Sequence, residues 1–221
     1  MDKVLPTGLL FLDLSKAFDT LDHNIMLDKL TVLGFNRAAV KWFRSYLITR
    51  TQSVNVNGVL SEPQIINFGV PQSSVLFIII YINELPSVVV SCNVELYADD
   101  ALIYFASKSL DEIQAHLTAD LRRINNWLQA NYLILNLDKT KAMLDGTHQK
   151  IASAGALEID ITHKRLELVE NFKYLGVLLY QTLSWKDHID YIGSKISSRL
   201  GILRRARKVL PKTTCLLLYN T

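Results

Sequence analysis

Three carboxylates next to apolar strands constrain the fold of this chain more than any other feature of its sequence. Leu9 to Leu14 is an apolar run with a single charge, Asp13, near its C-terminal end. Val94 to Phe105 contains two apolar segments around the adjacent pair Asp99 and Asp100. A charged carboxylate beside a buried strand is costly unless it is paired or bound to a cation. We therefore expect two neighbouring strands whose acids converge.

The composition predicts one large globular domain, or one domain with an appendage. Of the 221 residues, 49% are apolar and 20% are charged, which is enough for a packed core and excludes disorder. The longest apolar run, residues 75 to 82, is far shorter than the ~20 residues that cross a bilayer. The two cysteines form no zinc or disulfide pattern, and the N-terminus does not resemble a secretory signal. We expect an intracellular protein without a membrane partner.

The net charge of +3 is too small to indicate a polyanionic partner, but the charges are unevenly distributed. Residues 186 to 221 hold eight basic and two acidic side chains, which gives +6. The first 185 residues hold sixteen basic and nineteen acidic side chains, which gives −3. The charge therefore separates along the chain.

Hydrophobic periodicity and turn signals predict a mixture of helices and hairpins. The expected elements are a strand at 9–14, helices at 21–33 and 37–47, a hairpin at 53–68 that turns at Asn57-Gly58 and returns through 64–68, a buried helix or strand at 74–84, a hairpin at 94–105 with its turn at Asp99-Asp100, a capped helix at 109–128, strands at 141–144, 157–161, 165–168 and 172–180, and a basic amphipathic helix at 185–203. No internal repeat is present. This order favours an α+β fold with an antiparallel sheet covered by helices on one side.

The three acids suggest a magnesium site. Oxygen ligands without nearby histidine or cysteine suit Mg²⁺, and Asp13 with Asp99 and Asp100 could hold two ions for phosphoryl chemistry. The alternative is an ordinary β-turn, because aspartates are common in tight turns.

Five ordered motifs add a family resemblance that covers nearly the whole chain. Tyr97-Ala98-Asp99-Asp100, together with residues 11–19, 69–72, 136–143 and 172–177, resembles the palm of reverse transcriptases, and the match is close to those of non-long-terminal-repeat (LINE-like) retrotransposons. The resemblance implies a polymerase palm at residues 1–180 and an incomplete thumb at 181–221.

The resemblance also implies roles for the acids and for residues near the nucleotide. Asp13 and Asp99 would bind two Mg²⁺ ions, with Mn²⁺ as a possible substitute, and Asp100 would be a secondary catalytic acid. Phe18 would be a steric gate against a ribose 2′-hydroxyl, or simply a core aromatic. Gln72 would lie beside the incoming nucleotide, or be a polar turn residue.

Three further groups of residues are implied to contact substrate. Lys139 and Lys141 would lie near the departing pyrophosphate, or be a solvated strand edge. Tyr174, Leu175 and Gly176 would form the primer grip, or a strand bulge. Lys195, Arg199, Arg204 and Arg205 would follow duplex phosphates, or form a solvated helix face.

The sequence departs from the family pattern at four places. It begins a dozen residues before Asp13, so the fingers region is expected to be missing. Ser73 replaces a glycine, and about three residues are absent after Leu76, which corresponds to most of a helical turn. The sequence ends within the expected thumb.

Two functions of different classes follow. The first is a reverse transcriptase domain that copies an RNA template from a DNA primer with deoxynucleoside triphosphates, as a truncated fragment. The second is an inactive retroelement relic that only binds nucleic acid. A third, weaker possibility is another magnesium phosphoryl-transfer enzyme, but the sequence has neither a Walker-type loop nor an Asp-x-Asp pattern at Asp13.

Overall fold

The computed structural model describes residues 5–48, 50–71, 74–182, 184–207 and 209–219. The chain divides into two compact units, Met1–Val169 and Glu170–Thr221. The division lies before the boundary expected at residue 180, so the strands at 171–180 belong to the second unit, and the assignment of palm and thumb stays a prediction.

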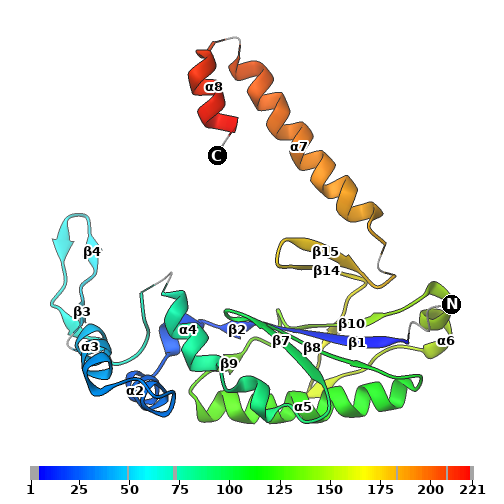
Figure 1. Cartoon of the computed structure of the whole chain (residues 1–221), viewed down its shortest axis with the longest axis horizontal. Helices are drawn as coiled ribbons and strands as arrows, with labels where there is room; N and C mark the ends of the chain where they lie inside the picture. The colour runs from blue at the N-terminus through cyan, green and yellow to red at the C-terminus, as the bar shows by residue number, and fades with distance from the viewer. Residues whose placement is uncertain (1–4, 49, 72–73, 183, 208, 220–221) are drawn as a thin grey trace. The chain divides into compact units, whose positions relative to one another are not determined.

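A five-stranded sheet organises the first unit, and its centre is the predicted N-terminal strand (Figure 1). The strand order is β13 (Glu167–Leu168), β10 (Lys141–Asp145), β1 (Thr7–Leu12), β8 (Asp100–Ala106) and β7 (Asn93–Tyr97). Neighbours are antiparallel except β10 and β13, which are parallel. β1 is paired on both sides, and its apolar residues Leu10, Phe11 and Leu12 are buried.

Helix α5 (Leu110–Ala130) packs against one face of this sheet (Figure 1). Ser109 caps the helix by accepting the Glu112 backbone N–H, as the sequence predicts. The buried stripe of α5 is Ile113, Leu117, Leu121, Ile124 and Leu128. A Cβ at Gly8 of β1 would overlap the side chains of Ile113 and Leu117, so glycine permits this close packing. The α+β fold with a helix-covered sheet is confirmed.

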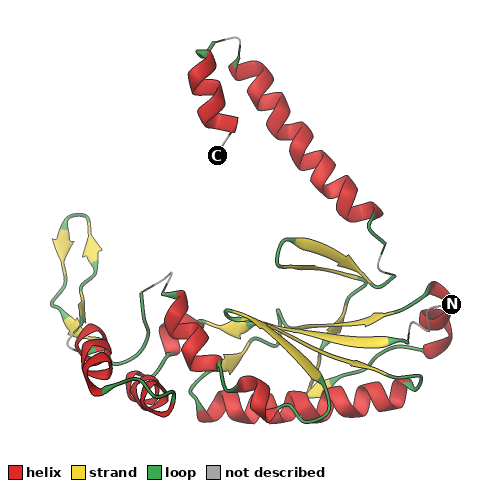
Figure 2. Cartoon of the chain, viewed as in Figure 1, coloured by secondary structure: helices red, strands yellow, loops and turns green. Residues whose placement is uncertain are grey.

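The remaining elements of the first unit are short, and Figure 2 shows them as separate helices and hairpins. They are α1 (Ala17–Thr20), α2 (His23–Val32), α3 (Arg37–Leu47), β3 (Thr51–Gln52), β4 (Asn55–Val56), β5 (Val59–Leu60), β6 (Gln64–Ile65), α4 (Val75–Ile82), the 3₁₀ turn η1 (Leu85–Val88), β2 (Leu14–Ser15), β9 (Ile134–Leu135), α6 (His148–Ala154), β11 (Asp160–Ile161) and β12 (Lys164–Arg165). Residues 75–82 are helical, so the strand alternative for this run is wrong.

The predicted Asn57-Gly58 hairpin forms, but its pairing differs from the expectation. Both turn residues have positive φ, 52° and 86°, as a type I′ turn requires. The strand that returns from this turn is β5, which pairs with β4, while β6 pairs with β3 further down. The direct return through 64–68 is therefore wrong, because a two-residue turn fixes the register of the residues adjacent to it.

The second unit contains the hairpin β14 (Asn171–Tyr174) and β15 (Val177–Tyr180) and the helices α7 (Lys186–Ala206) and α8 (Lys212–Tyr219). Helix α7 confirms the amphipathic helix predicted at 185–203. None of its described residues is buried, and its apolar side chains Ile189, Ile192, Ile196 and Leu200 are 40% to 64% exposed. Among the residues that the structure describes, no helix is long and apolar enough to span a bilayer.

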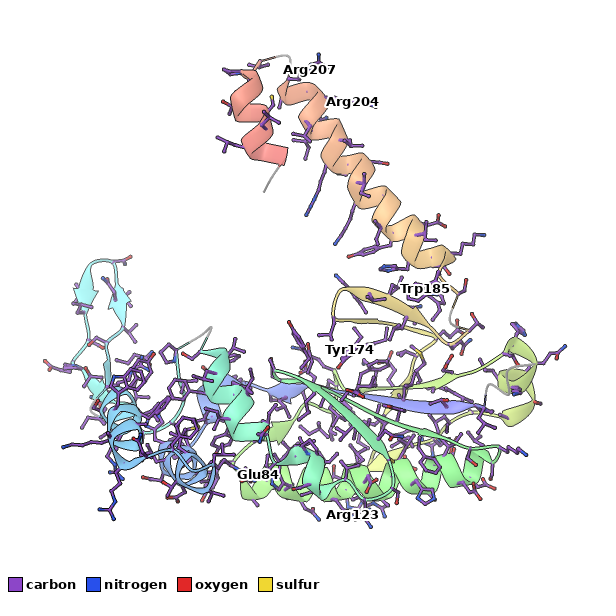
Figure 3. All side chains as sticks on the ribbon, in the orientation of Figure 1. Glu84, Arg123, Tyr174, Trp185, Arg204 and Arg207 are labelled. Atoms are coloured by element: carbon purple, nitrogen blue, oxygen red, sulfur yellow. The ribbon has the colours of Figure 1, made fainter. Side chains whose placement is uncertain are left out.

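A buried carboxylate that the sequence did not reveal fixes the chain before β7. The Asp120 side chain of α5 accepts the backbone N–H groups of Val90, Ser91 and Cys92 at 3.0, 2.8 and 2.8 Å. Arg123 makes an ion pair with it at 2.5 Å, and Figure 3 shows this arginine on α5. Burial alone would raise the pKa of Asp120, but the hydrogen bonds outweigh it and lower the pKa to about 2.

We expect Asp120→Asn to destabilise the protein by roughly 1–3 kcal/mol at about pH 7. A carboxyl group whose pKa is lowered by folding stabilises the protein at pH values above its unfolded-state pKa of about 4. This contribution decreases as the pH falls, and roughly half of it is lost by about pH 3. The difference between native protein and variant, measured by urea unfolding, should therefore shrink as the pH falls. Asp111→Asn, at an exposed position of the same helix, is the matched control. A pH-independent difference would contradict the assignment.

A second buried carboxylate, Asp145 at the end of β10, should lower the stability of the protein at neutral pH, whereas Asp120 raises it. It is 8% exposed, its Oδ1 has no hydrogen-bond partner among the described residues, and burial raises its pKa to about 6. A raised carboxyl pKa costs stability that grows as the pH rises from about 4 to about 6. We expect Asp145→Asn to stabilise the protein by about 1–3 kcal/mol at about pH 7.5 and to have little effect at about pH 4, as measured by urea unfolding.

Candidate active site

The pairing of β1 with β8 brings the predicted acids together. Leu12 pairs with Ala101, and continuing this register by one residue places Asp13 opposite Asp100. After Asp13 the chain leaves β8 and pairs with β9 through Leu14. Asp13 therefore lies at the end of β1, beside the start of β8.

The hairpin β7–β8 carries the other two acids, with a turn that differs from the prediction by one residue. Tyr97 pairs with Asp100, so the two loop residues are Ala98 and Asp99. The expectation of an Asp99-Asp100 turn is wrong, because Asp100 is already the first residue of β8. Ala98 has a φ of 53° and Asp99 does not have positive φ, which is the sign pattern of a type II′ turn. This turn presents Asp99 at the tip and Asp100 in the strand.

The three carboxylates are less buried than expected, and they repel one another. Asp13 and Asp99 are half-buried and Asp100 is exposed. Partial burial, followed by the charges of Asp99 and Asp13, raises the pKa of Asp100. The electrostatic cost at Asp100 is therefore desolvation first and repulsion from the two neighbouring acids second.

The donor set suits a hard divalent cation. Mg²⁺ binds through one or two carboxylates and takes its remaining oxygen ligands from water and substrate phosphates. Asp13 and Asp99 supply such carboxylates. Among the described residues, no three His, Cys, Asp or Glu side chains are arranged to hold a metal ion by themselves.

The structure separates the two lysines that the sequence paired. Lys139 Nζ lies 3.9 Å from Asp13 Oδ2, and this lysine side chain is 71% exposed. Lys141 Nζ instead lies 2.5 Å from Glu167 Oε2 on β13 and donates to the Asp138 carbonyl oxygen. Only Lys139 is therefore near the acids.

The segment that carries Lys139 is tied directly to Asp13. The Asp13 N–H donates to Thr140 Oγ1 at 3.3 Å, and the Asn136 N–H donates to the Asp13 carbonyl oxygen at 2.8 Å. Thr140 is fully buried. Sequence reasoning missed Thr140, because a single threonine in a polar loop carries no distinguishing signal.

Phe18 is held next to the loop that begins at Gly69. The Val70 N–H donates to the Phe18 carbonyl oxygen at 2.7 Å, and a Cβ at Gly69 would lie 2.9 Å from the carbonyl oxygens of Phe18 and Asp19. Gly69 also has a φ of 81°, so this position favours glycine twice over. Phe18 itself is half-buried against the core. Gln72 and Ser73 lie outside the described residues.

Buried polar side chains that the sequence analysis did not single out hold this loop. His23 Nε2 donates to the Gly69 carbonyl oxygen at 2.8 Å. Tyr81 Oη donates to the Asn131 carbonyl oxygen at 2.9 Å and accepts the Asp22 N–H at 3.3 Å. Burial raises the pKa of Tyr81 to about 12. A lone phenol within the apolar run 75–82 was the available signal, since a buried hydroxyl normally has a partner.

Two depressions border the site. One, of about 520 Å³, lies between α4 and the end of β7 and is lined mainly by apolar residues, among them Val75, Ile79 and Tyr97. The other, of about 440 Å³, is more polar and is lined by Asp19, Arg50, Gln52 and the loop at Gly69 to Pro71. The carboxylate turn therefore has open surface on the α4 side.

The second unit holds the remaining predicted residues. Tyr174 pairs with Val177, so Leu175 and Gly176 are the loop residues of a hairpin, with φ of 47° and 85°. This geometry is that of a type I′ turn rather than a bulge. The side chains of Lys195, Arg199, Arg204 and Arg205 on α7 are exposed, and Figure 3 marks Arg204 near the end of that helix. The Nζ atoms of Lys195 and Lys173 lie 4.5 and 5.4 Å from the centroid of the Tyr191 ring.

Solved structures with a similar fold include telomerases. The chain superposes on telomerase from Candida tropicalis in complex with a fragment of telomeric RNA with a TM-score of 0.56, at 14% identity over 82% of this chain and 29% of that one. For apo telomerase from the same organism, truncated from its C-terminal domain, the TM-score is 0.54, with 82% and 35% covered. This similarity concerns the fold.

Relatives among known proteins come from mobile elements. The RNA-directed DNA polymerase from mobile element jockey of Drosophila melanogaster is 29% identical over 205 residues, and the probable RNA-directed DNA polymerase from transposon BS of the same organism is 26% identical over 204 residues. These alignments cover 86% and 88% of this chain, but the chain spans only about a fifth of the length of either relative (21% and 22%). The predicted similarity to LINE-like elements is confirmed.

The family assignment rests on the extent of the match as well as on the site. The family model described as reverse transcriptase (RNA-dependent DNA polymerase) matches residues 2–195, which include both strands of the carboxylate hairpin and all of β1. The chain therefore belongs to the reverse transcriptase family.

Proposed function

We propose that this chain is the catalytic part of an RNA-directed DNA polymerase from a LINE-like element, which extends a DNA primer on an RNA template with deoxynucleoside triphosphates. The observation that carries the proposal is the β1–β8 register, which gathers Asp13 and Asp100 beside the Asp99 turn. Because the chain spans about a fifth of its relatives (21% and 22%), the activity, the substrates and the partners are proposed for this part of the protein.

In this proposal Asp13 and Asp99 hold two Mg²⁺ ions, for which Mn²⁺ can substitute. The bound ions would supply the positive charge that stabilises phosphoryl transfer. Asp100 acts as the secondary acid. The pKa of Asp100 is raised by partial burial and then by the charges of Asp99 and Asp13, and this cost of the charged form supports a role for cations at this place. The single contact with Lys139 at 3.9 Å is too long and too exposed to neutralise three carboxylates.

The neighbouring residues position the nucleotide. Phe18, whose carbonyl oxygen accepts the Val70 N–H, would exclude a ribose 2′-hydroxyl with its ring. Gln72 would contact the incoming nucleotide. Of the two lysines, Lys139 is the better candidate for a contact with the departing pyrophosphate, because Lys141 is engaged by Glu167. In the second unit, Tyr174, Leu175 and Gly176 would support the primer strand.

We expect Asp99→Asn to reduce primer extension at least about 100-fold, because a lost metal ligand removes several kcal/mol of charge stabilisation. The assay follows incorporation of dTTP on a poly(A) template with an oligo(dT) primer and Mg²⁺. Asp111→Asn, an exposed acid-to-amide change on α5, is the control and should leave incorporation unchanged. Equal incorporation by native protein and Asp99→Asn would exclude the proposed catalytic role. Binding of template-primer without any incorporation would favour the alternative of an inactive, nucleic-acid-binding relic.

We also expect the double variant Arg204→Ala/Arg205→Ala to bind duplex template-primer with a weaker dependence on salt. Each phosphate contact contributes about 0.9 to the slope of log K against log salt concentration, so the slope should fall by about 1.8. Lys108→Ala/Arg122→Ala removes two exposed charges from the first unit and is the matched control. A slope identical in the two variants and in native protein would remove these arginines from the contact surface.

A further inference from the structure

A long stretch of the first unit contains basic residues and no acids. Between Asp28 and Glu62 the sequence has five basic side chains, Lys29, Arg37, Lys41, Arg44 and Arg50, and no acidic one. Lys29 is buried and paired with Glu84. The side chains of Arg37, Lys41 and Arg44 are exposed, and none of the three forms an ion pair with the residues that the structure describes. Helix α3 therefore presents uncompensated positive charge.

The same helix carries a ladder of parallel aromatic rings. Buried Phe77 of α4 stacks on Tyr46 with centroids 5.5 Å apart and an interplanar angle of 13°. Tyr46 in turn stacks on Trp42 at 6.0 Å and 15°. Trp42, at the outer end, is 61% exposed. The ladder thus holds an exposed indole in a fixed orientation, anchored to the core.

The helical period places the aromatic and the basic side chains on opposite flanks of one exposed crest. At about 100° per residue, Phe43 and Leu47 define the buried face of α3, and both are at most 8% exposed. On one side of the exposed face lie Trp42 and Tyr46, and on the other lie Arg37, Lys41 and Arg44. The crest between them is formed by Ala38 and Ser45, which are exposed and small. A chain laid along this crest could contact both flanks.

From this arrangement we propose that α3 is a binding surface for an unpaired nucleic-acid strand, separate from the carboxylate site. Trp42 stacks on a base, and the basic flank binds the phosphates of the same strand. Single-stranded nucleic-acid sites combine these two features, because every base has a stackable face and every nucleotide a negative charge. The small residues of the crest allow the sugar-phosphate backbone to lie close to the helix.

Arg50 contacts both the aromatic ladder of α3 and the depression beside the Gly69 loop. Its guanidinium lies 5.8 Å from the centroid of the Tyr46 ring, and it also lines the depression that contains Gly69, Val70 and Pro71. A strand bound on α3 can therefore continue toward the loop next to Phe18, which suits an unpaired template. This inference rests on the proposed function only for the identity of the strand, because binding to α3 requires neither metal nor catalysis.

The test is equilibrium binding of labelled oligo(U), oligo(dT) and a blunt duplex, without Mg²⁺ or nucleotide. Stacking on an aromatic residue contributes 1–3 kcal/mol per base, so Trp42→Leu should weaken binding of both single strands about tenfold. Trp42→Phe, which keeps a ring, should retain most of the affinity. The duplex should be unaffected by either change, because its bases are already stacked on one another.

The role of the basic side chains is tested with the double variant Lys41→Gln/Arg44→Gln. For a single strand each lost phosphate contact reduces the salt slope by about 0.7, so the double variant should flatten it by about 1.4. The control Lys108→Gln/Arg122→Gln removes the same charge elsewhere in the first unit and should leave the slope unchanged.

Three results of the binding measurements would overturn the inference. They are single-strand affinity that Trp42→Leu does not change, an equal loss for single strands and duplex, and a salt slope that falls as much in the control as in Lys41→Gln/Arg44→Gln. If Trp42→Leu instead only dissociates a dimer in sedimentation, the aromatic ladder is a self-association surface and the inference is likewise overturned. Because these measurements do not depend on incorporation, a failure of the polymerase proposal leaves them interpretable.

Discussion

The antiparallel pairing of β1 with β8 is the interaction on which the rest of this structure depends. It brings Asp13 opposite Asp100 and, through the tight β7–β8 turn, keeps Asp99 close to both. Three like charges at one sheet end oppose folding, so the pairing must be stabilised elsewhere. The stabilisation comes from burial: β1 is paired on both sides, its Gly8 lets α5 pack closely, and the apolar side chains around it are almost fully buried.

Hydrogen bonds from four buried polar side chains support the segments around the three acids and the Gly69 loop. Asp120 holds the chain that enters β7, and Thr140 holds the backbone of Asp13. His23 and Tyr81 fix the segments around the Gly69 loop. All four side chains are almost fully buried, so each exchanges hydration for a defined hydrogen bond. The carboxylates themselves remain partly open to solvent. The segments around the acids are thus held by buried hydrogen bonds, while the acidic side chains stay accessible to solvent.

The sequence predicted those parts of the fold that are encoded locally. Helix α5 has a capping serine and a regular apolar stripe, and the Asn57-Gly58 turn needs only two residues of the right type. Contacts between distant segments were not predictable in this way. The ion pair between Lys141 and Glu167 joins residues 26 positions apart, and the anchoring of residues 90–92 by Asp120 joins a loop to a distant helix. Neither leaves a periodic signal.

Among the site residues, the three acids were predictable because a charge beside a buried strand needs an explanation. The geometry of the β7–β8 turn was not predictable. One residue of register distinguishes the expected Asp99-Asp100 turn from the observed Ala98-Asp99 turn. That difference matters because successive strand residues point to opposite faces. The positive φ at Ala98 could not be predicted from the residue type, because alanine does not favour this conformation.

The charges of the first unit then form a consistent arrangement. Three of its acids, Asp13, Asp99 and Asp100, lie at the β1–β8 end, where they would attract cations, and the acid-free stretch between Asp28 and Glu62 would attract polyanions. If all these charges were close together they would neutralise one another, as Lys29 and Glu84 do in their buried pair. None of the described ion pairs connects these acids with the basic side chains of the acid-free stretch. Under the two proposals, a nucleic-acid strand and a divalent cation would each be held by an oppositely charged region of the same unit, and charge separation within one fold would make the two bindings compatible.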